Sequence, residues 1–198
     1  MQGTPYVYQG EELGMTNAYF HKLEDYKDIE SIQYYTELTD AGLMEPDYMM
    51  KCLMLRSRDN ARTPMQWDGS EKAGFTDGEP WIKINPNCKE INAASQLDDL
   101  DSIFHYYQKL IALRKDPEYK ETVVYGELIP YLEEQHNLMS YYRKGDKTLL
   151  VLGNFQKKPQ TVKLPSACHK VLLNNYPELN ISNDSVILDN YQAVVIEL

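Results

Sequence analysis

The stretch Thr4-Pro5-Tyr6-Val7-Tyr8-Gln9-Gly10 is short, aromatic and β-branched, and it is bounded by proline and glycine. This pattern is typical of a mostly buried strand. A buried parallel strand needs neighbours on both sides, yet only three residues precede this one, which is unusual for a complete domain. Glu11 and Glu12 follow directly. In an α/β barrel they would lie at the end of the strand where loops deliver catalytic and binding groups.

Helical patterns flank a long irregular segment farther along the chain. Residues 28–35 predict the start of a helix with Asp28 as its N-cap, and residues 46–58 predict a second helix. A third, strongly periodic helix is expected between Asp101-Ser102 and Asp116-Pro117. Residues 61–92 contain six prolines and glycines. A loop of that length in a compact chain is usually functional, because ordering it costs conformational entropy.

After Glu121 the hydrophobic period changes to two, as expected for antiparallel strands separated by turns. The runs that carry this pattern are residues 138–142, 148–152, 161–164, 170–173 and 193–198. The final part of the chain therefore predicts a small β-sandwich or Greek-key module.

Composition narrows the class of protein. The 198 residues are 42% hydrophobic and 25% charged, which matches an ordinary globular chain. No apolar run approaches the roughly 20 residues of a membrane-spanning helix, and the first residues lack a signal-peptide pattern. A net charge of -10 makes nucleic-acid binding improbable. Three widely separated cysteines predict neither disulfides nor a metal site, which is typical of a cytoplasmic protein. We also expect no cofactor.

The aromatic residues leave two interpretations open. Tyrosine dominates, with 16 residues against 4 phenylalanines and 2 tryptophans, and its ring and hydroxyl suit surfaces that meet sugars as well as many other surfaces. Trp67 and Trp81 both fall in the long loop. A sugar ring could stack on either, but packing that pins the loop is at least as probable a role.

The acidic residues are candidates for binding or proton transfer. Glu11 and Glu12 are either site residues or a solvated pair at a strand exit. Asp28 and Glu30 could hold sugar hydroxyls or act as acid and base. Hydrolysis of a glycosidic bond requires two carboxyl groups about 5 to 10 Å apart, and sequence spacing does not show such a distance.

The run from Arg56 to Arg62 is dense in polar function. An arginine presents a rigid fork of donors that can orient a carboxylate and also donate to a ligand hydroxyl. Arg58 and Arg62 lie four residues apart and would share a face of a helix. The alternative is that both form structural salt bridges to Asp59, Asp68 or another acidic neighbour.

Three ordered stretches resemble the α-amylase superfamily. They are Gly3-Thr4-Pro5-Tyr6-Val7-Tyr8-Gln9-Gly10-Glu11-Glu12-Leu13-Gly14-Met15-Thr16-Asn17, Asp28-Ile29-Glu30-Ser31 and Arg58-Asp59-Asn60-Ala61-Arg62-Thr63-Pro64-Met65-Gln66-Trp67-Asp68. The resemblance is strongest to the oligo-1,6-glucosidase branch, which includes dextran glucosidases, sucrase-isomaltase-like α-glucosidases and trehalose-6-phosphate hydrolases.

This resemblance implies an α+β chain: the C-terminal remnant of a (β/α)8 barrel followed by an antiparallel β-sandwich domain. Residues 1–120 would hold the last strand, the loops and the closing helix of the incomplete barrel. Residues 121–198 would form the all-β domain. The family's nucleophilic Asp, acid/base Glu and transition-state-stabilising Asp would all come earlier in a longer chain. The resemblance thus implies a glycoside hydrolase whose catalytic residues are not in this sequence.

The residues that carry over from the family would bind substrate. Arg58 resembles the arginine that holds the nonreducing-end glucose in subsite −1, and Glu30 resembles the acidic residue that contacts the sugar in subsite +1. Glu11, Glu12 and Arg62 resemble residues that support the wall of this substrate-binding site. Ser57 and Gln33 stand where relatives often have Gly and Asn, a small departure.

Two hypotheses follow. The first is the C-terminal segment of a cytoplasmic, retaining α-glucosidase of the isomalto-oligosaccharide type, inactive alone. Its partners would be an α-glucosidic oligosaccharide in the full-length enzyme, together with a missing N-terminal barrel or a second copy of the chain. The alternative is a stand-alone carbohydrate-binding or interaction module. The sequence does not determine which linkage, α-1,6, α-1,4 or that of trehalose 6-phosphate, is preferred.

Overall fold

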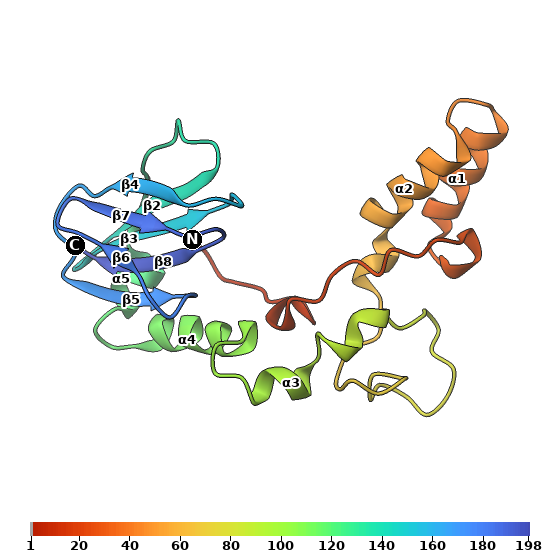
Figure 1. The fold of residues 1–198 in the computed structure, drawn as a ribbon, viewed down its shortest axis with the longest axis horizontal. Coiled ribbons are helices and arrows are strands. Elements are labelled where there is room, and N and C mark those ends of the chain that lie inside the picture. Colours follow the sequence, from red (N-terminus) through yellow and green to blue (C-terminus); the bar gives the residue numbers. More distant parts are fainter. Residues whose placement is uncertain (1) are drawn as a thin grey trace. The chain divides into compact units, whose positions relative to one another are not determined.

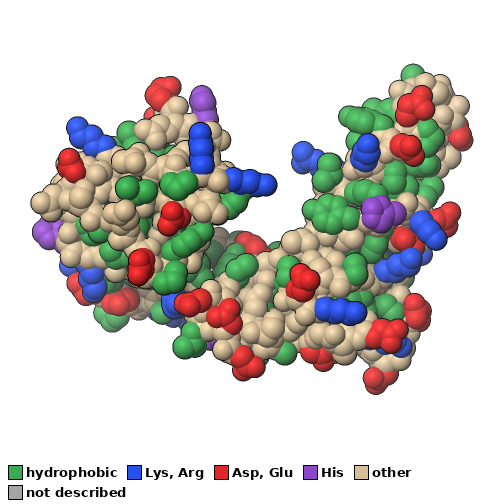
Figure 2. Space-filling view, in the orientation of Figure 1, with side chains coloured by type: hydrophobic (Ala, Val, Ile, Leu, Met, Phe, Trp, Pro, Cys, Tyr) green, Lys and Arg blue, Asp and Glu red, His purple; other side chains and the backbone are tan. Residues whose placement is uncertain are grey.

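The computed structural model describes residues 2–198, and its chain divides into two compact units (Figure 1). One unit is formed by residues 7–104. The other is formed by residues 2–6 together with 105–198. On the face seen in Figure 2, acidic and basic side chains are scattered among apolar ones.

The unit of residues 7–104 is built on two helices, α1 (Ile29–Asp40) and α2 (Pro46–Arg56), which lie side by side (Figure 1). Asp28 caps α1 by accepting a hydrogen bond from the Ser31 amide, and a proline in the first turn starts α2. The remaining elements of the unit are short: η1 (Glu11–Leu13), η2 (Leu23–Asp25), η3 (Arg58–Ala61), η4 (Pro86–Lys89) and α3 (Ala93–Leu97).

A small core joins the helices to the loop segments. Its buried members are Ala18, Phe20, Tyr26, Met49, Leu53 and Ile82. They come from the segment before α1, from α2 and from the long loop. Burial of Ile82, which is 1% exposed, therefore helps to hold the long loop against the helices.

Tyr26 makes the stability of this unit depend on pH in the alkaline range. Its hydroxyl donates to the Phe20 carbonyl, and burial, with smaller contributions from Asp59 and Asp25, raises the pKa of Tyr26 to about 12. Because the pKa of a tyrosine in an unfolded chain is about 10, the contribution of protonated Tyr26 to the free energy of unfolding is fully present below pH 10. It is lost as pH rises towards 12, by about 2 to 3 kcal/mol.

The measurement is urea unfolding followed by tryptophan fluorescence at pH 8 and 11, since both tryptophans lie in this unit. The variant Tyr26→Phe should lose less stability between the two pH values than the unmodified chain. Equal losses would contradict the assignment.

The second unit is an antiparallel β-sandwich with helices at its start. It contains most of α4 (Ile103–Lys115), then α5 (Lys120–Tyr125) and eight strands. The strands are β1 (Glu127–Pro130), β2 (Leu138–Lys144), β3 (Thr148–Asn154), β4 (Gln160–Lys163), β5 (Lys170–Asn174), β6 (Asn180–Ile181), β7 (Ser185–Leu188) and β8 (Ala193–Glu197). The larger sheet has the order β1-β2-β3-β8-β5, and the smaller has the order β4-β7-β6.

The apolar run of β3 explains how the layers pack. Leu150 and Leu152 point into a core shared with the smaller sheet, which supplies Val162 and Val186. Leu149, on the opposite face, packs in a cluster with Tyr119 and with partly buried residues of α4. Both faces of the larger sheet are thus covered, so β3 reads as a continuous hydrophobic run rather than an alternating one.

The expected helices near residues 28, 46 and 103 are confirmed, as are the five expected strands of the β-sandwich. The strand expected over residues 4–10 is wrong. In the described part of the chain no segment pairs with it, and the Tyr6 side chain is 91% exposed. The sequence carries the strand propensity, but a strand forms only where a neighbour accepts its backbone hydrogen bonds. No helix within residues 2–198 is long and apolar enough to cross a bilayer.

Candidate functional site

Arg58 and Glu30 meet at the surface of the residue 7–104 unit. Arg58 is the first residue of η3, one residue after Ser57 ends α2, and Glu30 lies in the first turn of α1. Arg58 Nη2 is 3.9 Å from Glu30 Oε2, and the two side chains are 68% and 60% exposed. A tight charge-assisted pair would be about 1 Å shorter. Both groups therefore keep donors and acceptors free for a ligand.

Asp59 is the buried anchor that brings these segments together. Its side chain is fully buried, and Oδ2 accepts hydrogen bonds from the backbone amides of Lys27 (2.7 Å) and Asp28 (2.9 Å). Oδ1 accepts from Nε of Arg62 at 3.1 Å and also from its Nη2. One carboxylate thus links the start of α1 to η3, and the position of Glu30 relative to Arg58 follows from that link.

Asp28 adds a second connection between the same segments. Its Oδ2 accepts from the Ser31 hydroxyl (2.7 Å) and amide (3.1 Å), and the Ser31 hydroxyl lies 2.9 Å from that of Ser57. The hydrogen bond from the Ser31 hydroxyl lowers the pKa of Asp28, with further help from Arg58 and Arg62. A carboxylate held ionised in this way suits an anchor and not a proton donor.

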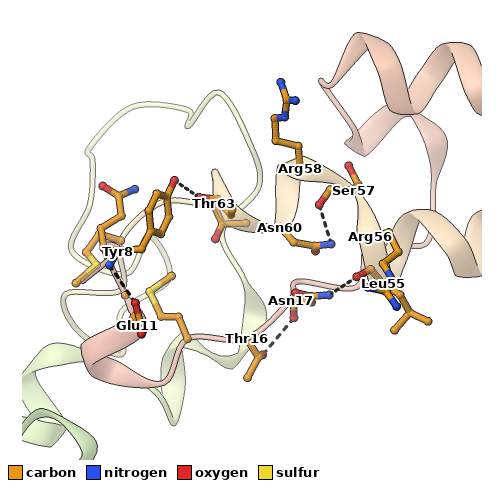
Figure 3. A pocket seen from close by; sticks show the side chains of 15 residues that line it. Tyr8, Glu11, Thr16, Asn17, Leu55, Arg56, Ser57, Arg58, Asn60 and Thr63 are labelled. Carbon is orange, nitrogen blue, oxygen red and sulfur yellow. Dashed lines mark hydrogen bonds between the residues drawn. The ribbon is translucent and has the colours of Figure 1, made fainter. Parts of the chain in front are cut away.

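Two cavities border Arg58. The larger, of about 510 Å³, includes Tyr8, Glu11 and Asn17 in its lining, and Figure 3 shows Arg58 extending away from these side chains. The smaller, of about 370 Å³, is lined on its other side by Glu30 and by residues of both helices. Arg58 lines both cavities. Arg58 therefore stands at the border between the two cavities.

Gly10 determines where Glu11 stands. Its φ of 87° is left-handed, and a Cβ there would lie 2.5 Å from Met15 Sδ, so this turn requires glycine. Glu11 Oε2 accepts from the Tyr8 amide at 3.1 Å, while the Tyr8 hydroxyl donates to the Ala61 carbonyl at 2.9 Å. The segment before η1 is thereby tied to η3, beside Arg58.

The other two predicted residues line a cavity whose lining includes neither Arg58 nor Glu30. Glu12 and Arg62 line a third cavity, and the Arg62 guanidinium carbon lies 5.1 Å from the centre of the Trp81 ring. The structure thus brings Arg58 and Glu30 together, places Glu11 on the adjoining cavity and separates Glu12. Arg62 forms the salt bridge to Asp59 that the sequence left open as an alternative. Nothing in the sequence marked the burial of Asp59.

Comparison of the chain with models of known protein families identifies its family. Residues 1–126 match the family model described as the catalytic domain of alpha amylase. The chain belongs to the alpha-amylase family. Residues 138–195 match a second family model, the C-terminal domain of the alpha-amylase SusG. This member of the family therefore combines part of the catalytic barrel domain with an antiparallel β domain, as the sequence predicted.

Curated relatives within the family are glycoside hydrolases. An oligo-1,6-glucosidase of Parageobacillus thermoglucosidasius is 47% identical over 181 residues, which cover 89% of this chain and 32% of the relative. An oligo-1,6-glucosidase of Bacillus cereus is 43% identical and a trehalose-6-phosphate hydrolase of Bacillus subtilis 40%, each covering all of this chain and 36% of the relative. The chain thus spans about a third of the length of the curated relatives it matches.

Solved structures of the alpha-amylase family agree. A trehalose-6-phosphate hydrolase of Bacillus licheniformis superimposes with a TM-score of 0.91 at 43% identity, covering 100% of this chain and 36% of that protein. An isomaltulose synthase of Erwinia rhapontici, solved with D-glucose, gives 0.92 at 36% identity with the same coverage. These relatives act on different sugars, so the likeness shows the family and leaves the substrate open.

Proposed function

We propose that this chain supplies the substrate-binding wall of a cytoplasmic, retaining α-glucosidase that hydrolyses short α-glucosides of the isomalto-oligosaccharide type. The loose pair of Arg58 and Glu30, at the border of two cavities, is the observation that carries the proposal. Arg58 donates to hydroxyls of the terminal glucose, and Glu30 accepts from hydroxyls of the next sugar. The names of the oligo-1,6-glucosidase relatives support the choice of substrate.

The reacting carboxylates come from polypeptide outside residues 2–198. Retaining hydrolysis uses two carboxyl groups about 5 to 5.5 Å apart, one nucleophilic and one protonated. Around Arg58, the Asp28 and Asp59 carboxylates are already engaged by backbone amides, hydroxyls or Arg62. They fix the wall in position. Neither is available to attack a sugar.

The domain boundaries follow from this proposal. Residues 1–120 belong to the catalytic barrel and residues 121–198 to the β domain. The partner is the rest of a barrel or a second copy of this chain. Exposed apolar side chains favour a polypeptide partner: Tyr6, Val7 and Leu55 are 91%, 47% and 60% exposed, and Figure 2 shows hydrophobic side chains on the surface of the α1–α2 region.

The test compares this chain with a chimera in which it replaces the matching third of the Bacillus cereus oligo-1,6-glucosidase. We expect the chimera to hydrolyse p-nitrophenyl α-glucoside and isomaltose, and the isolated chain to hydrolyse neither. A folded but inactive chimera would contradict the proposal. So would activity of the isolated chain that exceeds a heat-killed control and disappears in Glu30→Gln. An inactive chimera whose isolated chain still binds isomaltose would favour the stand-alone binding module.

A further inference from the structure

Tyr34 lies one helical turn beyond Glu30 on α1, on the same side of the helix. Residues four apart on a helix are neighbours, with their Cβ atoms about 5–6 Å apart. Both side chains line the cavity of about 370 Å³ that Arg58 borders. The ring of Tyr34, which is 53% exposed, therefore continues the wall of this cavity beyond the Arg58–Glu30 pair.

The same cavity is elongated along both helices. On α2 its lining runs from Met49 to Arg56, about 10 Å along the helix axis at a rise of 1.5 Å per residue. On α1 it runs from Glu30 to Tyr34, about 6 Å. A ligand longer than the two sugars assigned to Arg58 and Glu30 therefore has room to continue along α1.

Contacts on either side of Tyr34 fix its direction. The hydroxyls of Ser31 and Ser57 lie 2.9 Å apart and hold the start of α1 against the end of α2. One turn further along α1, Tyr35 packs against the core cluster that contains Leu53. These contacts set the rotation of α1 about its axis, so the ring of Tyr34 is presented on a rigid element. A ligand that stacks on it pays little to order the helix.

An aromatic ring next to a carboxylate suits a sugar. The C–H face of a pyranose packs on an aromatic ring, and the phenolic hydroxyl of Tyr34 both donates and accepts hydrogen bonds. Arg56, on the opposite wall of the cavity, adds guanidinium donors for sugar hydroxyls. Because the cavity is continuous with the Arg58–Glu30 pair, a sugar at Tyr34 would belong to the same substrate chain.

We propose that Tyr34 is a specificity-determining residue, which stacks on the third sugar of an α-glucoside and makes the enzyme favour substrates of three or more units over disaccharides. The order of the sugars rests on the proposed function, in which Arg58 holds the terminal glucose and Glu30 the second unit. A disaccharide ends at Glu30, so the ring contributes binding energy only to longer substrates. Such energy from a remote sugar is expressed in kcat/KM.

The experiment measures kcat/KM for isomaltotriose and for isomaltose in the chimera with the Bacillus cereus oligo-1,6-glucosidase. The unmodified chimera should prefer isomaltotriose. In Tyr34→Ala we expect the ratio of the two values to fall about fivefold, the worth of one aromatic contact. Tyr34→Phe keeps the ring and should keep most of the ratio. Thermal unfolding checks that both variants are folded.

Tyr48→Ala is the matched control. Tyr48 is 58% exposed on α2, close to the exposure of Tyr34, and it lines none of the three cavities described above. Its removal should leave the ratio as it is in the unmodified chimera.

The outcomes separate the role of Tyr34 from the proposed function. A chimera that hydrolyses neither sugar contradicts the proposed function, and the role of Tyr34 falls with it. An active chimera without a preference for isomaltotriose overturns the role of Tyr34 alone, as does a ratio that is the same in Tyr34→Ala and Tyr48→Ala. Equal losses for both sugars in Tyr34→Ala, with a lower Tm, would show that the ring serves the fold and not the length of the substrate.

Discussion

Replacing Asp59 by alanine is expected to lower the free energy of unfolding of the residue 7–104 unit by about 3 to 5 kcal/mol. The fully buried carboxylate accepts from two backbone amides and from Arg62. Its removal leaves the amides of Lys27 and Asp28 without an acceptor and the Arg62 charge without its partner. Asp59→Asn should cost less, because one amide oxygen still accepts while the NH2 group opposes the arginine donors.

Urea unfolding followed by tryptophan fluorescence measures the global effect, and amide hydrogen exchange of Lys27 and Asp28 measures the local one. Asp77→Ala, which removes an exposed carboxylate in the same unit, is the control and should change stability little. Unchanged protection of the two amides in Asp59→Ala would show that this carboxylate is not what links α1 to η3.

Arg58→Ala in the chimera is expected to reduce kcat/KM roughly 10- to 100-fold. The side chain is largely exposed and its contact with Glu30 is long, so the fold does not depend on it. The loss therefore reflects binding of the sugar in the transition state. Arg58→Lys keeps the charge but not the two-pronged donor geometry, and an intermediate loss is expected.

Steady-state kinetics with isomaltose measures this effect, and thermal unfolding checks that stability is preserved. Lys51→Ala is a matched control, since it removes a long exposed cation from the neighbouring helix α2. If Arg58→Ala behaved like Lys51→Ala in kcat/KM, Arg58 would not belong to the substrate site.

Local signals in the sequence were sufficient for most of the fold. The cap at Asp28, the proline at the start of α2 and the apolar spacing of α4 each act within a few residues, and the structure places helices there. Strands β1, β6 and β7 were not predicted, because none of them carries a run of alternating apolar residues. The strand prediction over residues 4–10 was wrong for the opposite reason. Strand propensity is a local property of the sequence, but a strand also needs a pairing partner, which local sequence does not supply.

The candidate site was less accessible to sequence reasoning. Arg58 and Glu30 were chosen by their resemblance to a family, and their separation of 28 residues gave no sign that they would meet. The structural cause of the meeting, the buried Asp59, looked in the sequence like one more polar residue in an arginine-rich run. Burial depends on the tertiary arrangement of α1 and η3, which no local pattern encodes.

The place of β8 has a consequence for how the sandwich is made in the cell. This strand lies between β3 and β5, so residues 193–197 pair on both sides with segments synthesised earlier. While residues 193–197 are still being translated, β3 and β5 each keep one edge whose backbone N–H and C=O groups have no partner strand. The larger sheet therefore closes only once residues 193–197 have been synthesised, and until then its two open edges are exposed to pairing with other chains.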